Sequence, residues 1–189
     1  PSTKGSSVAI SSDTSGTTYY VKACVSDSKC SAVSSYTAKL DSTKPNKPSF
    51  EIRVDSRTGS NYTSNSWTKK NGYFIVKSSD STSGIDYYEV SVNGNAWVKH
   101  NDWNYEISND HKTMYSMINW DGNWTFKFRA VDYAGNRSDE STTIRFKRDT
   151  TGPSFGTVSL NPNLTSWTNR CGGKINVSWN LTDSTSGLK

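Results

Sequence analysis

The sequence predicts an all-β fold made of two-sheet β-sandwiches, and three observations lead to that prediction. Apolar and polar residues alternate along several short segments, which is typical of strands with one buried face. Clusters of Gly, Asn, Asp, Ser and Thr separate these segments, and no stretch has a convincing helical period. Similar segments also recur about one hundred residues apart, so the strand pattern belongs to a repeated unit.

Composition narrows the class of protein. Hydrophobic residues make up only 32% of the 189 residues, but aromatic residues reach 12%, which argues against a disordered chain. No apolar run is long enough to span a membrane. The net charge of +5 comes from Lys and Arg residues that are scattered along the sequence without forming a basic run. We therefore expect no nucleic-acid partner.

Four pairs of similar segments define the repeat, and each pair is separated by a nearly constant distance. They are SWT at 66–68 and 166–168, DSTSG at 80–84 and 183–187, PSF at 48–50 and 153–155, and two hairpin segments around Ala23 and Ala130. We predict one complete unit at residues 44–148. Residues 1–43 are predicted to be the C-terminal part of a unit, and residues 149–189 the N-terminal part of a further one. The boundaries fall in LDSTKPNKP and KRDTTGP, which read as extended connectors.

Seven segments of the complete unit are predicted to be strands. They lie near residues 48–55, 72–79, 85–93, 96–100, 111–118, 122–132 and 138–147. Alternation places four apolar sets on inward faces, namely Phe50, Ile52 and Val54; Tyr88, Val90 and Val92; Trp124, Phe126, Phe128 and Ala130; and Ile144 and Phe146. Asn93-Gly94 is a strong hairpin signal. Seven short antiparallel strands in about one hundred residues suit a two-sheet sandwich.

Four motifs carry a resemblance to a known family. DSTSGIDYYEV, VNGNAW, FRAVDYAGNRS and KRDTTGP resemble strand openings, hairpins and junctions of bacterial immunoglobulin-like (Ig-like, or fibronectin III-like) tandem repeats of extracellular surface proteins. The resemblance covers residues 44–155 well and the flanking parts in fragments. It implies tandem Ig-like β-sandwiches in a non-enzymatic bacterial surface or adhesin-like protein that is extracellular, on the cell surface or secreted. The motifs consist of turn and core residues, so they specify no chemistry.

Two cysteines stand in one copy of the repeated hairpin. Alignment of VKACVSDSKCSAV with FRAVDYAGNRSDE puts Cys24 and Cys30 opposite each other, where the other copy has Val131 and Arg137. We predict a cross-strand disulfide that holds a turn lacking the Gly-Asn of the other copy; two reduced thiols are the alternative. Cys171 either pairs with a cysteine outside this sequence or is free.

No pattern of catalytic or metal-binding residues stands out. His100 and His111 neighbour neither the cysteines nor a Gly-x-Ser-x-Gly motif, and no Asp-x-Asp-x-Asp run occurs. We therefore predict that the protein is not an enzyme and has no cofactor and no metal site. A weaker alternative is a calcium ion at a unit junction, near the loop residues Asp80, Asp86, Asp132 and Asp139.

Aromatic residues near loops give the strongest binding signal. Trp97, Trp103, Tyr105 and Trp120 lie in or beside hairpin loops, where exposed rings could stack on sugars. The competing interpretation, which we favour because Trp is usually buried, is that Trp97 packs in the sandwich and the others cover its ends.

Two functions remain. The first is a structural spacer or stalk, whose partners are neighbouring Ig-like units of the same or adjacent chains. The second is a recognition module that binds a glycan or a host or surface protein through the loop aromatics. Junctions that bury their loops would favour the spacer, and a contiguous exposed aromatic patch would favour recognition.

Overall fold

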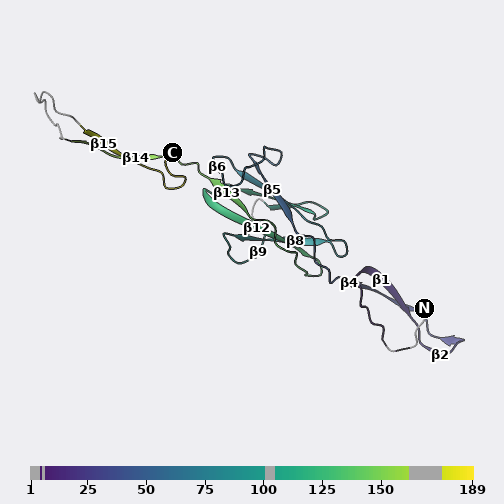
Figure 1. Ribbon diagram of the computed structural model, residues 1–189. Helices are drawn as coiled ribbons and strands as arrows, with labels where there is room; N and C mark the ends of the chain where they lie inside the picture. The colour runs from purple at the N-terminus through teal and green to yellow at the C-terminus, as the bar shows by residue number, and fades with distance from the viewer. Residues whose placement is uncertain (1–4, 6, 101–104, 162–175) are drawn as a thin grey trace, which may run out of the picture.

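The computed structural model describes residues 5, 7–100, 105–161 and 176–189. Every regular element in these ranges is a β-strand, so the all-β prediction is confirmed. Figure 1 shows an elongated arrangement in which a central body of two sheets lies between two separate hairpins. Among the described residues, no helix could cross a membrane.

The central body consists of two β-sheets. One contains four antiparallel strands in the order β10 (Tyr105–Ile107), β11 (Thr113–Ile118), β7 (Gly72–Lys77) and β5 (Ser49–Val54). The other contains five strands in the order β6 (Trp67–Thr68), β13 (Ile144–Arg148), β12 (Gly122–Asp132), β8 (Ile85–Val92) and β9 (Val98–Lys99). Only β6 and β13 pair in parallel among these strands.

The two sheets pack face to face around an aromatic core. The four-stranded sheet contributes Ile52, Phe74, Val76, Met114 and Ile118, and the five-stranded sheet contributes Ile85, Tyr88, Val90, Phe126, Phe128, Ala130 and Phe146. The ring of Phe50 lies 5.0 Å from that of Phe128 and meets it edge-on across the two sheets. The alternation therefore placed the inward residues of these strands correctly, and each fully buried large side chain stabilises the fold by about 1.5–3 kcal/mol.

Two short strands, β6 and β10, were not predicted, and the last strand is shorter than expected because β13 begins at Ile144. The cause of the shortening lies in two buried serines. The hydroxyls of Ser138 and Ser141 accept hydrogen bonds from the backbone N–H groups of Ala130 and Phe128, each at 2.9 Å. These hydroxyls take the place of backbone carbonyls, so residues 138–143 lie beside β12 without forming a regular ladder.

The predicted turn at Asn93-Gly94 is present. Asn93 has a φ of 53° and Gly94 a φ of 77°, the left-handed conformations that such a turn requires. The Asn95 N–H donates to the Val92 carbonyl at 3.0 Å and closes the turn. The sequence signal therefore specified the backbone here correctly.

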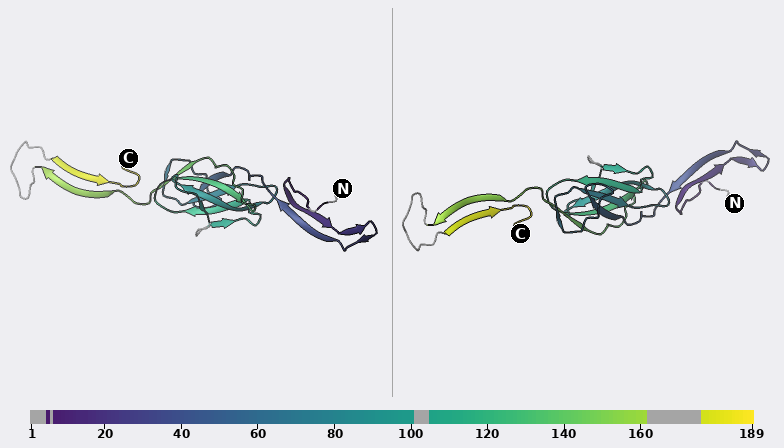
Figure 2. Two further views of the ribbon diagram at one scale, coloured as in Figure 1. Left: turned by 90° about the horizontal axis from the view of Figure 1, so that it is seen from below. Right: turned by 90° about the horizontal axis from the view of Figure 1, so that it is seen from above.

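Two hairpins extend from opposite ends of the central body (Figure 2). The first pairs β1 (Thr14–Val21) with β4 (Ser34–Leu40), and its tip pairs β2 (Cys24–Ser26) with β3 (Lys29–Cys30). The second pairs β14 (Ser154–Asn161) with β15 (Asn176–Thr182). Both carry exposed large apolar side chains, including Tyr20, Val21, Tyr36, Phe155, Val158 and Trp179.

The first hairpin pairs positions equivalent to those of β12–β13 in the central body, which has one additional residue between its paired strands. Tyr19 faces Tyr36 and Thr17 faces Ala38 in the first hairpin; the corresponding pairs are Phe126 with Ile144 and Trp124 with Phe146. In the tips, Cys24 pairs with Cys30, and Val131 pairs with Arg137. The division into units at residues 43/44 and 148/149 remains a prediction.

Candidate functional site

The connector between β4 and β5 is bound to loops of the central body. The Oδ2 atom of Asp41 accepts a hydrogen bond from the Ser83 N–H at 3.0 Å, and the Asn136 side-chain amide donates to the Asp41 carbonyl at 3.1 Å. Ser83 belongs to the loop between β7 and β8, and Asn136 to the turn after β12. A single connector residue is thus held by two separate loops.

A second aspartate holds the same connector from the other side. Asp13 lies just before β1 and accepts hydrogen bonds from the Ser42 N–H at 2.9 Å, from the Ser42 hydroxyl at 2.7 Å and from the Thr43 hydroxyl at 2.5 Å. The hydrogen bonds from Thr43 and Ser42 lower the pKa of Asp13 below its ordinary value, because they stabilise the ionised carboxylate. The connector is therefore tied to the first hairpin as well as to the central body.

The connector between β13 and β14 makes the corresponding contacts. The Oδ2 atom of Asp149 accepts from the Ser186 N–H at 3.1 Å, as Asp41 does from Ser83. Asp121 accepts from the Thr150 N–H at 3.2 Å and from its hydroxyl at 2.6 Å, as Asp13 does from the other connector. The hydroxyl of Thr150 lowers the pKa of Asp121.

The two DSTSG loops that receive these connectors have the same internal structure. The Oδ1 atom of Asp80 accepts from the N–H groups of Thr82, Ser83 and Gly84, each at 2.9 Å. The Oδ1 atom of Asp183 accepts from the equivalent residues of its loop at 2.9–3.1 Å. Gly84 and Gly187, which end the two loops, have φ values of 82° and 78°, a backbone conformation that residues with a side chain rarely adopt. Both loops therefore present a preformed N–H to their connector.

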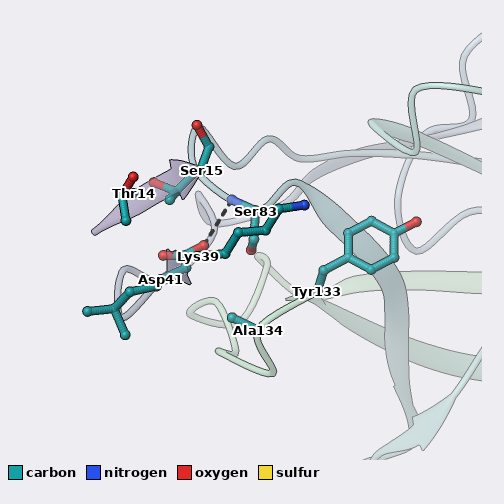
Figure 3. A pocket seen from close by; sticks show the side chains of 9 residues that line it. Thr14, Ser15, Lys39, Asp41, Ser83, Tyr133 and Ala134 are labelled. Carbon is teal, nitrogen blue, oxygen red and sulfur yellow. Dashed lines mark hydrogen bonds between the residues drawn. The ribbon is translucent and has the colours of Figure 1, made fainter. Parts of the chain in front are cut away.

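An open cavity of about 470 Å³ lies at the first junction (Figure 3). Its lining residues include Thr14, Ser15, Lys39, Asp41, Ser83 and Tyr133. The Tyr133 hydroxyl lies 3.1 Å from Nδ1 of His111, and that nitrogen also lies 3.1 Å from the Ile85 carbonyl. The cavity thus separates the first hairpin from the central body beside the hydrogen-bonded connector.

Three aspartates at this junction could hold a hard cation such as Ca²⁺. Asp41, Asp80 and Asp132 each place one carboxylate oxygen within 4.8 Å of the others. Each carboxylate also accepts backbone N–H hydrogen bonds; Asp132, for example, accepts from Ala134 at 2.9 Å and from Asn136 at 2.8 Å. These hydrogen bonds are sufficient to explain why the three carboxylates lie close together. Of the aspartates considered in sequence, Asp139 instead pairs with Lys44.

The loop aromatics come from different elements and contact different neighbours. Trp97 is half-buried, and the guanidinium of Arg129 lies 4.5 Å from the centre of its ring. Tyr105 on β10 is half-buried with its ring 5.4 Å from that of His100, and burial raises the pKa of its hydroxyl. Trp120 is 39% exposed and lies 5.7 Å from Trp124. Trp103, the fourth member of the predicted set, lies outside the described residues.

Cys24 and Cys30 form a disulfide, the pairing predicted from the sequence. Their Cα atoms are 4.0 Å apart, and both residues are exposed. The bonded tip turns at Asp27 and Ser28 without a positive φ at either residue, whereas Gly135 in the other tip has a φ of 92°. The two tips therefore turn differently, as expected for a turn without Gly-Asn. Cys171 lies outside the described residues.

The connector aspartates were not predicted from the sequence as site residues. Asp41 and Asp149 stood in the predicted boundaries, but their side-chain bonds to Ser83 and Ser186 join residues far apart in sequence. The available signal was the recurrence of Asp-[Ser/Thr]-Thr at both boundaries together with the recurrence of DSTSG.

Comparison with known proteins yields no family-model match and no match to a curated protein. The Ig-like resemblance therefore rests on the sequence motifs.

Proposed function

We propose that this chain is a non-catalytic spacer, built from tandem Ig-like β-sandwich units like those of extracellular bacterial surface or adhesin-like proteins. The observation that supports this most strongly is the equivalence of the two connectors. Asp41 and Asp149 bind the DSTSG loops that follow them, and Asp13 and Asp121 bind the connectors themselves. Two junctions with the same contacts are what a serial array requires.

A spacer must keep its units at a defined separation, so its connectors must resist bending. The first connector contains Pro45 and Pro48 and the second contains Pro153, which restrict the backbone. Side-chain hydrogen bonds then fix each connector to the elements on both sides. An unattached Gly- or Ser-rich linker of the same length would behave as a flexible coil.

The arrangement of the elements also suits a spacer. The hairpins leave the central body at opposite ends (Figure 2), and the central body closes its own apolar core. A unit with a closed core can be repeated along a line without needing its neighbours for folding. In that arrangement, length is set by the number of units.

Recognition through loop aromatics has less support. Trp97 is already covered on one face by Arg129, and Tyr105 packs against His100 at the sheet edge. Trp120 packs against Trp124, so each of the three described rings has a neighbour of its own. Stacking on a sugar would need an open ring face.

Small-angle X-ray scattering of the 189-residue chain tests the spacer. We expect an extended particle with limited flexibility, and increased flexibility in the double variant Asp13→Ala, Asp121→Ala. The matched control is Asp27→Ala, which removes an exposed aspartate from the hairpin tip and should leave the scattering unchanged. A wild-type chain as flexible as the double variant would contradict the proposal.

A further inference from the structure

The outer face of the five-stranded sheet is basic. Because Phe126, Phe128 and Phe146 point into the core, the residues that alternate with them point outward. These outward residues are Lys127 and Arg129 on β12 and Arg145 and Lys147 on β13. Lys99 on β9 lies opposite Glu89 of β8 in the strand register and shares its face, so three strands contribute Lys or Arg residues to this face.

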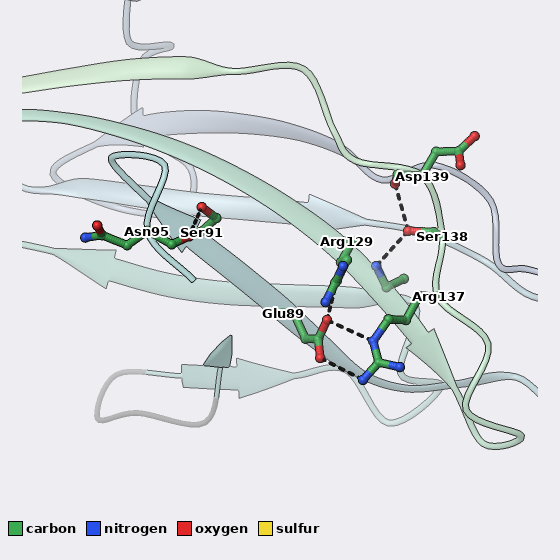
Figure 4. A network of polar contacts seen from close by, with 8 residues as sticks. Glu89, Ser91, Asn95, Arg129, Arg137, Ser138 and Asp139 are labelled. Atoms are coloured by element: carbon green, nitrogen blue, oxygen red, sulfur yellow. Dashed lines mark hydrogen bonds and ion pairs between the residues drawn. The ribbon is translucent and has the colours of Figure 1, made fainter. Parts of the chain in front are cut away.

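Two carboxylates balance part of this charge. Glu89 is only 6% exposed and pairs with both Arg129 and Arg137, as Figure 4 shows. Glu140 pairs with Lys127 at 2.8 Å. Within the described part of the chain, Lys99, Arg145 and Lys147 form no ion pair, so the positive charge of this face exceeds its negative charge.

The outer face of the four-stranded sheet differs. There Arg53 pairs with Glu51 at 3.1 Å, and Arg57 pairs with Glu106. Each of these arginines has its own carboxylate, which neutralises its charge. Because side chains alternate between the two faces along β12 and β13, basic residues that are scattered along the sequence lie together on one face of the sheet.

Three aromatic rings on the basic face have cations above them. Lys147 lies 5.5 Å from the ring centre of Trp67, and Lys99 lies 4.1 Å from that of Tyr87. Arg129 covers Trp97 in the same way at 4.5 Å. These contacts hold the long cationic side chains in place and leave less ring surface for stacking on a ligand.

We propose that this face binds an acidic polysaccharide, a linear polyanion recognised through its charges. Neighbouring strands lie about 4.8 Å apart, so the cations on the adjacent strands β13 and β12, together with Lys99 on β9 beyond β8, can contact successive charged groups of an extended polymer. Binding of single-stranded nucleic acid normally adds base stacking on open aromatic rings, which the cations above Trp67, Tyr87 and Trp97 hinder. Among the described residues of this face, no helix projects that could enter a duplex groove.

Titration calorimetry with heparin tests this surface, since heparin is an acidic polysaccharide available in defined lengths. We expect binding by the 189-residue chain that weakens steeply with added salt, because bound cations release counterions from the polymer. The double variant Arg145→Gln, Lys147→Gln should lower the affinity and should reduce the slope of log affinity against log salt concentration by about two, one for each lost contact. Melting curves of the variant report whether its fold is retained.

The matched control is Lys77→Gln, Lys112→Gln, which removes the same charge from exposed lysines outside this face. Its heparin affinity should stay close to that of the wild type. Equal weakening by both double variants would show that only the net charge matters and would overturn the proposed face. Tighter binding of single-stranded DNA than of heparin would identify the partner as a nucleic acid and would also overturn the proposal, as would no heparin binding at low salt.

Discussion

The first hairpin and the β12–β13 hairpin pair equivalent positions but have very different surroundings. Val21 on β1 corresponds to Phe128 on β12; Val21 is 60% exposed, whereas Phe128 is fully buried. Ser31 and Ser138 make the same hydrogen bonds to Ala23 and Ala130. Alternation and turn residues are therefore enough to specify a hairpin, whereas burial depends on the sheet that packs against it.

The tips of the two hairpins are secured in different ways. Arg137 is held by Glu89 of the neighbouring strand β8. Cys30 occupies the corresponding position in the first hairpin, where β1 pairs only with β4 among the described strands, and is held by Cys24. The first hairpin therefore has a disulfide at the position where the central body has an ion pair between Arg137 and Glu89 of the adjacent strand β8.

Substitutions of equivalent apolar residues in the two hairpins should show the largest difference in the free energy of unfolding. Phe128→Ala should lower the free energy of unfolding of the central body by about 3 to 5 kcal/mol, because it leaves a cavity between the two sheets. Val21→Ala should change it by less than about 0.5 kcal/mol, since the side chain is exposed. Chemical denaturation followed by tryptophan fluorescence measures both, and equal losses would show that the first hairpin is also buried.

The ion pairs at the central tip should have the next largest effect. Glu89→Gln removes a buried charge shared by Arg129 and Arg137 and should cost about 2 kcal/mol, since both arginines keep some contact with solvent. Amide hydrogen exchange should increase at residues 131–137 and stay unchanged at residues 24–30. Reduction of the disulfide should instead increase amide exchange at residues 24–30 and leave it unchanged at residues 131–137. Increased exchange at both tips in either experiment would contradict this independence.

Removal of the serine hydroxyls gives a smaller effect. Ser138→Ala leaves the N–H of Ala130 buried without its acceptor and should cost about 1 to 2 kcal/mol. Ser31→Ala should cost under about 0.5 kcal/mol, because water can reach the exposed N–H of Ala23. Thermal unfolding of the two variants measures both losses of stability. A larger loss for Ser31→Ala than for Ser138→Ala would refute the prediction.

The smallest effect concerns pH at the connectors. The pKa values of Asp13 and Asp121 are lowered from about 3.8, so their hydrogen bonds contribute fully above that pH. The contribution is lost only as the pH falls through the lower, folded-state pKa. The amide proton shifts of Ser42 and Thr150 in NMR spectra should therefore titrate with midpoints below 3.8. Midpoints above that value would contradict the role of these bonds.

The sequence predicted what depends on local pattern. Alternation identified the inward residues of β5, β8, β12 and β13, and Asn93-Gly94 identified a turn. The strands β6 and β10 are two and three residues long, too short for a period to be recognised. Ser138 and Ser141 shortened β13 because their hydroxyls replace backbone acceptors, an effect that residue type alone does not reveal.

The candidate site depended on contacts between distant residues. The hydrogen bond from Ser83 to Asp41 joins a loop to a connector 42 residues earlier, so no local period marks it. The basic residues are scattered along the chain but are clustered in space. Lys127 and Arg129, like Arg145 and Lys147, alternate with core residues, and this alternation was the signal for a basic face.

The central claim is that both connectors are held rigidly by the same contacts. Distance measurements by electron paramagnetic resonance test it most directly, with spin-labelled non-natural amino acids at the exposed positions Ser35, Thr142 and Ser178. We predict narrow distance distributions for the pairs 35–142 and 142–178, and broadening only of the first pair in Asp13→Ala and only of the second in Asp121→Ala. Broad distributions for both pairs in the wild-type chain would contradict the account.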